Sequence, residues 1–262
     1  MITSHCNCSH HISDQPEWFT LLFHGTVSQL ALSACRMPIM ITLIARRSRH
    51  FAGRRFLKRG VNLVGDVANE VETEQIVHDT SYAFLRHGRV SSYVQMRGSV
   101  PLFWSQESSK VVVGRPPLEI LRDDPFYESM GLHFASLLER HGSPVIVLNL
   151  MKKREKRHFE TILSDGFERG IIYLSQFLPS RIPQPSDSLS TLFTETIDSS
   201  PPLMYIGFDI ARVQKMKRTV VLDKLQPIID NCVRRTGIFF SSSASLPISE
   251  IQFEKHRTIG FK

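Results

Sequence analysis

Cationic side chains are concentrated in one short stretch of the sequence. Between Arg46 and Arg59 there are seven Lys or Arg residues and no Asp or Glu, so no residue within the stretch neutralises its charge. All but one are arginines, whose planar guanidinium groups donate paired hydrogen bonds to phosphate oxygens. A solvated charged surface is the simplest interpretation of such a run. The missing carboxylates and the preference for Arg over Lys instead favour a site that binds a phosphorylated anion.

The spacing of this stretch argues against an exposed helix as its support. Such a helix would carry Asp or Glu four residues away from its cations, and Gly53 and Gly60 weaken any helix here. We therefore expect the cations to be presented from strand ends and turns. In the acidic segment that follows, Glu70, Glu72 and Glu74 alternate, so a strand would place all three on one face. Internal pairing with the nearby arginines is favoured over a catalytic role for these carboxylates.

The same region carries a family resemblance. The segments ARRS (45–48), AG (52–53), RFLKRG (55–60) and GDVANEVETEQI (65–76) resemble the signature of the Sac-domain phosphoinositide phosphatases. Further blocks of that family resemble residues 92–106, 124–126, 133–134, 142–144 and 148–150. The segments FLKRG, GDVANEVETEQI and REKR are most similar to those of the polyphosphoinositide phosphatase subgroup, which acts on phosphatidylinositol 3,5-bisphosphate. The resemblance covers residues 17–178 and 203–240.

This resemblance implies roles for particular residues. Five cationic residues match motif positions and are expected to line part of a groove for an inositol headgroup: Arg46, Arg47, Arg55, Lys58 and Arg59. Four others match motif positions to which no role is assigned: Asn69, Glu72, Glu74 and Arg97. One departure is visible, because Arg54 stands where the family usually has threonine. It adds a charge beside the expected groove.

Members of this family hydrolyse phosphate esters with the cysteine of a C-x5-R loop, in which backbone N–H groups and the arginine stabilise the thiolate and the transferring phosphoryl group. The cysteines here are Cys6, Cys8, Cys35 and Cys232, and none has an arginine six positions later. The resemblance therefore predicts no catalytic residue in this chain, which is expected to be a fragment, truncated at both ends and inactive alone. In the complete protein the cysteine would attack the 5-phosphate, and water would release the phosphocysteine. That mechanism requires no cofactor and allows activation by Mg²⁺.

Composition limits the classes of partner. The chain has 262 residues, 42% of them hydrophobic, and its net charge of +7 permits an acidic partner. Aromatic residues suited to base stacking are nearly absent from the basic stretch, which argues against nucleic acid. The longest apolar stretch, from Leu30 to Ala45, is interrupted by Arg36 and Pro38 and is too short to cross a bilayer. No metal site is expected either, because Cys6, Cys8 and their histidine neighbours are too crowded to enclose zinc.

Two functional interpretations remain open. The first is a phosphatase that, in its complete form, hydrolyses the 5-phosphate of phosphatidylinositol 3,5-bisphosphate. The second is a catalytically inactive fragment that binds acidic lipid or the partners of the full enzyme. By resemblance those partners are phosphoinositide lipids, the endosomal membrane surface, and the phosphatidylinositol 3-phosphate 5-kinase with its scaffold. The expected location is cytoplasmic, peripheral on endosomal or vacuolar membranes.

The expected fold class is α/β, a mixed sheet flanked by helices that forms a partial Sac phosphatase domain. Strands are expected at 19–23, 39–45, 93–96, 111–113, 144–150 and 203–208, and helices at 125–140, 154–177 and 220–236. Phe126, Met130, Phe134 and Leu138 form the apolar face of the first helix, with Asp123 or Asp124 as its cap, and the third is expected to bury Val221, Leu225, Ile228 and Ile229. The expected divisions are a disordered tail (1–16), a remnant of an amino-terminal subdomain (17–45), a partial catalytic core (46–179), a flexible insertion (180–202), a continuation of the core (203–240) and an irregular tail (241–262).

Overall fold

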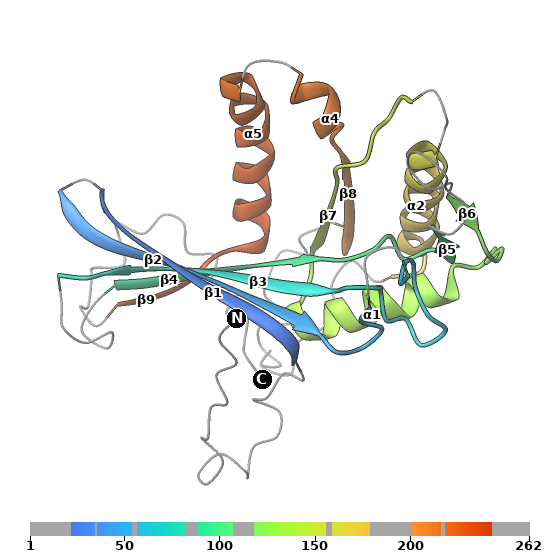
Figure 1. The fold of residues 1–262 in the computed structure, drawn as a ribbon, viewed down its shortest axis with the longest axis horizontal. Helices are drawn as coiled ribbons and strands as arrows, with labels where there is room; N and C mark the ends of the chain where they lie inside the picture. Colours follow the sequence, from blue (N-terminus) through green and yellow to red (C-terminus); the bar gives the residue numbers. More distant parts are fainter. Residues whose placement is uncertain are drawn as a thin grey trace, which may run out of the picture.

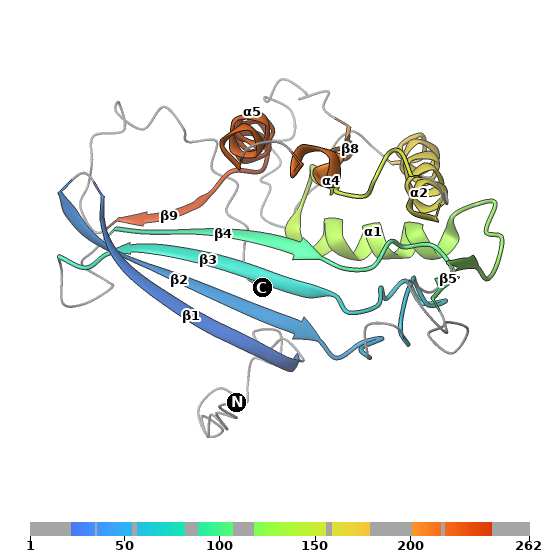
Figure 2. The same ribbon diagram turned by 45° about the horizontal axis from the view of Figure 1, so that its top comes forward.

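The fold is known from a computed structural model that describes residues 22–34, 36–53, 57–81, 89–106, 118–155, 159–178, 201–215 and 218–242. Four long strands form an antiparallel meander: β1 (Leu22–Ala34), β2 (Met37–Ser48), β3 (Val71–Asp79) and β4 (Arg89–Arg97). A short strand, β9 (Phe239–Ser242), pairs with β4 and completes the order β1-β2-β3-β4-β9. Figure 2 shows these strands lying side by side.

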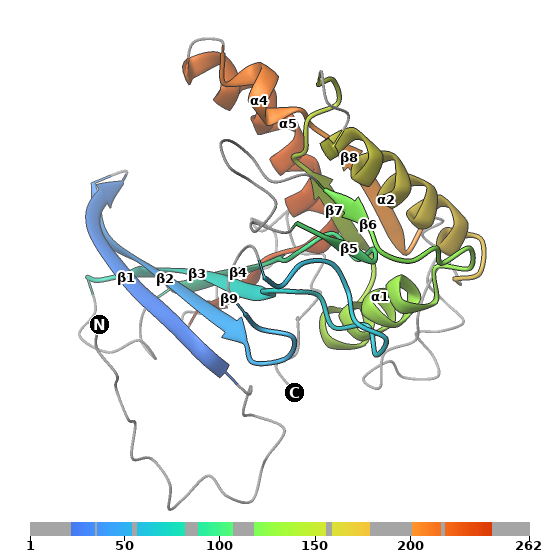
Figure 3. The ribbon, with the colours of Figure 1, turned by 45° about the vertical axis from the view of Figure 1, so that its right-hand side comes forward.

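A second layer is built around two parallel strands, β7 (Val145–Asn149) and β8 (Leu203–Gly207). Three longer helices accompany them: α1 (Glu128–His141), α2 (Phe159–Ser175) and α5 (Arg218–Thr236), with the short α4 (Ile210–Val213) following β8. A small ladder joins β5 (Trp104–Ser105) to β6 (Glu119–Ile120). In Figure 1 the parallel pair stands between α5 and α2, on one side of the long antiparallel sheet, and Figure 3 shows the same pair from another direction. The α/β class is confirmed, with the antiparallel and parallel strands in separate sheets.

The hydrophobic core lies between α1, α2 and β8. Its buried members are Met130, Phe134, Leu137, Leu138, Phe167, Ile171 and Leu203. Three of the four expected apolar positions of α1 are therefore confirmed, but Phe126 is 63% exposed. It falls outside the helical repeat because Tyr127 is left-handed (φ 52°) and α1 begins only at Glu128, whose backbone N–H donates to Asp124 Oδ1 at 3.2 Å. Gly142, with φ 78°, ends the helix where the sequence predicts.

The long sheet extends beyond the strands expected from sequence. β1 and β2 pair along their whole lengths, from Leu22 opposite Ser48 to Ala34 opposite Met37, so pairing recruits polar residues that carry no strong strand signal. The expected boundary at residue 45 falls inside β2, and the one at residue 240 falls inside β9. Pro202, expected in the insertion, is buried and accepts a hydrogen bond from Val145 N at 2.8 Å.

The helices also differ from expectation at their ends. α2 begins at Phe159 rather than 154, and α5 packs its apolar side only partly, with Ile229 47% exposed. Of the helices in the described part of the chain, none combines the length and the apolar character that a membrane span needs. The strand expected at 111–113, the tail at 1–16 and residues 180–200 of the insertion lie outside the described residues.

Candidate anion-binding site

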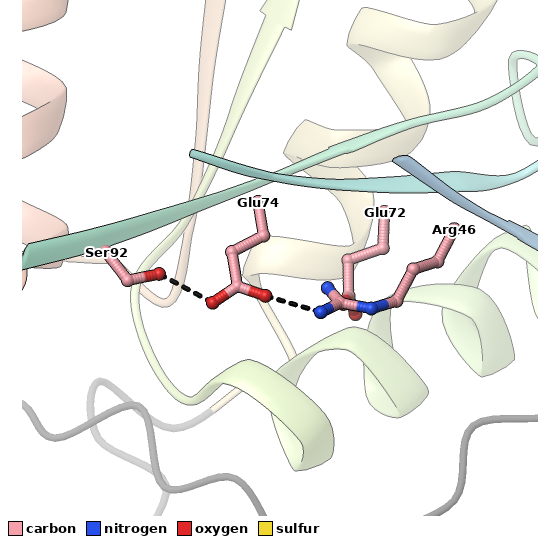
Figure 4. A network of polar contacts seen from close by, with 4 residues as sticks. All are labelled: Arg46, Glu72, Glu74 and Ser92. Atoms are coloured by element: carbon pink, nitrogen blue, oxygen red, sulfur yellow. Dashed lines mark hydrogen bonds and ion pairs between the residues drawn. The ribbon is translucent and has the colours of Figure 1, made fainter. Parts of the chain in front are cut away.

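Two adjacent arginines of β2 point to opposite faces of the long sheet, because side chains alternate along a strand. Arg46 lies on the face that also carries Glu72 and Glu74 of β3. Its guanidinium group contacts Glu72 Oε1 at 3.0 Å and Glu74 Oε2 at 2.6 Å (Figure 4). Ser92 Oγ of β4 donates to the other oxygen of Glu74 at 2.8 Å. The expected pairing of these glutamates with a nearby arginine is confirmed.

Arg47 faces the other side of the sheet and lines a cavity of about 500 Å³. Two further arginines reach the same cavity from distant parts of the sequence, Arg59 from the loop after β2 and Arg97 from the end of β4. The other lining residues are Gly25, Thr26, Ala45, Gly53, Ala68, Asn69, Val71, Gly98 and Ser99. The described lining contains no Asp or Glu. A cavity of this composition attracts anions.

Asn69 is the hydrogen-bonding centre of the cavity wall. Its backbone is left-handed, with φ 58°, a conformation that asparagine tolerates better than most residues. The Oδ1 atom accepts from Gly53 N at 3.3 Å and from Arg47 Nη2, and Nδ2 donates to Lys58 O at 3.3 Å. Arg47 Nη2 also donates to Gly53 O at 2.6 Å. Asn69 therefore links Gly53 and Lys58, two points in the segment after β2, to the residues just before β3. It also holds the Arg47 side chain in place.

Arg59 is held by a different set of contacts. Its Nη2 atom donates to Gln106 Oε1 at 3.1 Å, and its guanidinium carbon lies 5.3 Å from the centre of the Trp104 ring. Both partners are buried, Trp104 at 7% exposure and Gln106 at 5%. The next residue, Gly60, has φ 74°, and a Cβ there would lie 2.4 Å from Leu102 O. Only glycine lets the loop turn so closely against the strand that presents Trp104.

The expected cationic set is thus divided by the fold. Arg47 and Arg59 line the cavity, whereas Arg46 is engaged by two carboxylates on the far face. Lys58 lies with Nζ 4.5 Å from the centre of the Phe51 ring, and it is not among the lining residues. Arg55 lies outside the described residues. Arg97, to which the sequence assigned no role, joins the cavity because β4 runs antiparallel to β3 and ends opposite Val71.

Burial is the main cause of the pKa shifts of three described groups outside the cavity lining. Burial lowers the pKa of His133, and burial followed by the charge of Arg140 lowers the pKa of His141 to about 4, so both are neutral at pH 7. Arg140 instead pairs with Glu70 at 3.0 Å. Burial raises the pKa of Cys232, the opposite of what a nucleophilic thiolate needs. Among the residues that the structure describes, no three His, Cys, Asp or Glu side chains gather to hold a metal ion.

Comparison with known proteins identifies the family and agrees with this α/β fold. The family model described as the SacI homology domain matches residues 1–215, and the chain belongs to that family. It is 43% identical over 241 residues to a polyphosphoinositide phosphatase of Schizosaccharomyces pombe, which covers 89% of this chain and 26% of that protein. It is 41% identical over 229 residues to phosphatidylinositol-3-phosphatase SAC1 of Arabidopsis thaliana, covering 87% and 23%.

A third relative, phosphoinositide phosphatase SAC3 of Arabidopsis thaliana, is 48% identical over 162 residues, which are 62% of this chain and 20% of that protein. The resemblance found in the sequence is therefore confirmed. The chain spans about a quarter or less of the length of these relatives. The names of all three relatives refer to phosphoinositides, and only the name of the second specifies the position of a phosphate.

Proposed function

We propose that this chain supplies the headgroup-binding part of a phosphoinositide phosphatase, with the phosphate groups held by Arg47, Arg59 and Arg97. The observation that carries the proposal is that three arginines, from three separate segments, line one cavity whose described lining has no carboxylate. A phosphate monoester carries about 1.5 to 2 negative charges at neutral pH. Two such groups on an inositol ring therefore match three arginines well in charge.

The contacts around these arginines support binding rather than a purely structural role. The hydrogen bonds that Arg47 and Arg59 donate to Gly53, Asn69 and Gln106 end on neutral oxygens. These bonds hold the two guanidinium groups in fixed orientations beside the cavity. Groups held in place before the ligand arrives lose less entropy when it binds. The cavity of about 500 Å³ also falls within the usual size range of small-ligand sites.

For the complete protein we propose phosphatidylinositol 3,5-bisphosphate as substrate, hydrolysed at the 5-phosphate. The support is the sequence resemblance to the polyphosphoinositide phosphatase subgroup. These 262 residues contain no C-x5-R sequence, so we expect this chain alone to bind the lipid headgroup without releasing phosphate. By the same resemblance we place the protein on endosomal or vacuolar membranes with the phosphatidylinositol 3-phosphate 5-kinase and its scaffold.

The test is calorimetric titration of the purified 262-residue chain with short-chain, water-soluble lipids. The expected order of affinity is the 3,5-bisphosphate, then the 3-phosphate, then unphosphorylated phosphatidylinositol. Arg97→Gln should weaken binding of the bisphosphate about tenfold or more, because a hydrogen bond to a charged group contributes about 1.5–3 kcal/mol. Phosphate release is assayed in the same samples.

Arg89→Gln is the matched control, since Arg89 is exposed at the opposite end of the same strand and does not line the cavity. Its affinity should equal that of the wild type. Equal affinity for phosphorylated and unphosphorylated lipid would overturn the binding proposal. Phosphate release by the 262-residue chain would leave binding intact and overturn its expected inactivity.

A further inference from the structure

A second cationic surface lies at the edge of the small parallel sheet where the strands β7 and β8 end. Parallel pairing sets Asn149 opposite Gly207, so the segments that follow the two strands leave the sheet at the same edge. Five described cations belong to these segments: Lys152, Lys153 and Arg154 after β7, and Arg212 and Lys215 after β8. Four of them are exposed, and Lys152 is half-buried. We call these five residues the basic edge.

Specific contacts join the two segments of the basic edge. Asp209 accepts a hydrogen bond from Lys153 N at 3.0 Å through one carboxylate oxygen and from Arg212 N at 2.9 Å through the other. Although partial burial opposes it, the pKa of Asp209 is lowered by these backbone hydrogen bonds and by the charges of Arg212 and Lys152. The Lys153 side chain packs against Gly207, the last residue of β8. A Cβ added to Gly207 would lie 2.8 Å from Lys153 Cε. The hydrogen bonds to Asp209 hold the backbones of the two cationic segments beside each other.

The two segments carry a large excess of positive over negative charge. Residues 152–157 contain five cations and one carboxylate, and residues 209–218 contain four cations and one carboxylate. Their combined formal charge therefore equals the +7 of the whole chain. Two segments that lie more than fifty residues apart in sequence meet only because β7 and β8 are parallel neighbours.

The composition of the two segments selects among acidic partners. Neither segment contains an aromatic residue. Protein interfaces depend on buried aromatic and arginine anchors, and single-stranded nucleic acids depend on aromatic stacking. An anionic membrane needs neither, because clustered Lys and Arg side chains are attracted to the lipid surface as a group. We propose that the basic edge docks the chain on an anionic lipid surface, independently of the headgroup cavity.

The proposal is tested by flotation of the full 262-residue chain with phosphatidylcholine vesicles that contain 30% phosphatidylserine and no phosphoinositide. The basic-edge variant carries Lys153→Gln, Arg154→Gln, Arg212→Gln and Lys215→Gln. Each cation near an acidic membrane strengthens binding about fivefold, so losing four should weaken binding of the variant by roughly six hundredfold. Binding of the wild type should also fall steeply between low salt and about 0.5 M NaCl.

The matched control changes the same amount of charge elsewhere, with Arg89→Gln, Arg122→Gln, Arg169→Gln and Arg234→Gln, all at exposed positions. It should retain most of the vesicle binding, and circular dichroism should show both variants folded. The basic-edge variant should keep its calorimetric affinity for the soluble headgroup. Membrane docking by the basic edge and headgroup binding by the cavity are therefore tested separately. Equal losses in the two variants, or tighter binding to duplex DNA or polyglutamate than to the vesicles, would overturn the proposal.

Discussion

Replacing Arg46 with methionine should destabilise the fold and leave headgroup binding intact. Methionine keeps an apolar stem but removes the guanidinium group that contacts Glu72 at 3.0 Å and Glu74 at 2.6 Å. The Glu74 side chain is only 7% exposed, so the change strands a buried carboxylate. Breaking a buried ion pair costs about 3–5 kcal/mol. Because the Arg46 side chain is 23% exposed and Glu72 is 18% exposed, solvent moderates the loss, and we expect about 3 kcal/mol.

The assay is thermal unfolding followed by circular dichroism, with headgroup titration at low temperature where the variant is still folded. A loss of about 3 kcal/mol lowers the Tm by roughly 6–12 °C for a domain of this size. The adjacent substitution Arg47→Met is the comparison. It removes a lining residue of the cavity and should weaken headgroup binding about tenfold or more.

Two results would refute this reasoning. The first is an Arg46→Met variant that loses as much headgroup affinity as Arg47→Met, since the two side chains would then share a function. The second is an unchanged Tm. Adding Glu74→Gln to Arg46→Met removes the stranded charge, so the double variant should melt above the single one.

Other substitutions test the loop and the buried histidine. Asn69→Ala should weaken headgroup binding and lower the free energy of unfolding by about 2 kcal/mol, since alanine loses the side-chain hydrogen bonds and disfavours φ 58°. Asn69→Gly also loses the hydrogen bonds but accepts φ 58°, so urea unfolding of the two variants separates the backbone cost from the hydrogen-bond cost. Gly60→Ala should lower the Tm because its Cβ would meet Leu102 O at 2.4 Å. Gly131→Ala is the control, since it lies within α1 with its Cβ 3.3 Å from a flexible leucine methyl, and its Tm should be unchanged or higher. A lower Tm for both variants would contradict the geometry. The lowered pKa of His141, about 4, means that the unfolded chain binds a proton between pH 6.5 and 4 that the native chain does not, so stability falls as the pH falls through that range, by at most about 3 kcal/mol. His141→Asn should reduce that dependence in urea unfolding at pH 7.5 and pH 5, and an unchanged slope would be evidence against it.

Local patterns predicted the helical core better than the long sheet. The repeat of Met130, Phe134 and Leu138 located α1 because burial on one face of a helix leaves a period in the sequence. Phe126 continued the same repeat, but the left-handed turn at Tyr127 is a backbone event that the repeat does not reveal. Most of β1 was missed because its partner β2 provides the pairing, and its own residues from His24 to Gln29 show no regular alternation of apolar and polar side chains.

The sequence predicted the type of candidate site but not all of the residues that line it. The run from Arg46 to Arg59 predicted an anion-binding site, and two of its arginines line the cavity. The strand was expected to end at residue 45, however, so the sequence did not predict that Arg46 and Arg47 lie on opposite faces of the sheet. Arg97 lies fifty positions after Arg47 and joins it only through the register of β2, β3 and β4. Long-range pairing of that kind leaves no local signal.

The most direct test of the central claim is a crystal structure of the 262-residue chain with the soluble inositol phosphate headgroup bound. We predict phosphate oxygens at about 2.7–3.0 Å from guanidinium nitrogens of Arg47, Arg59 and Arg97, with Arg46 still paired to Glu72 and Glu74. A headgroup bound on the Arg46 face of the sheet, or bound with none of the three arginines in contact, would contradict the account.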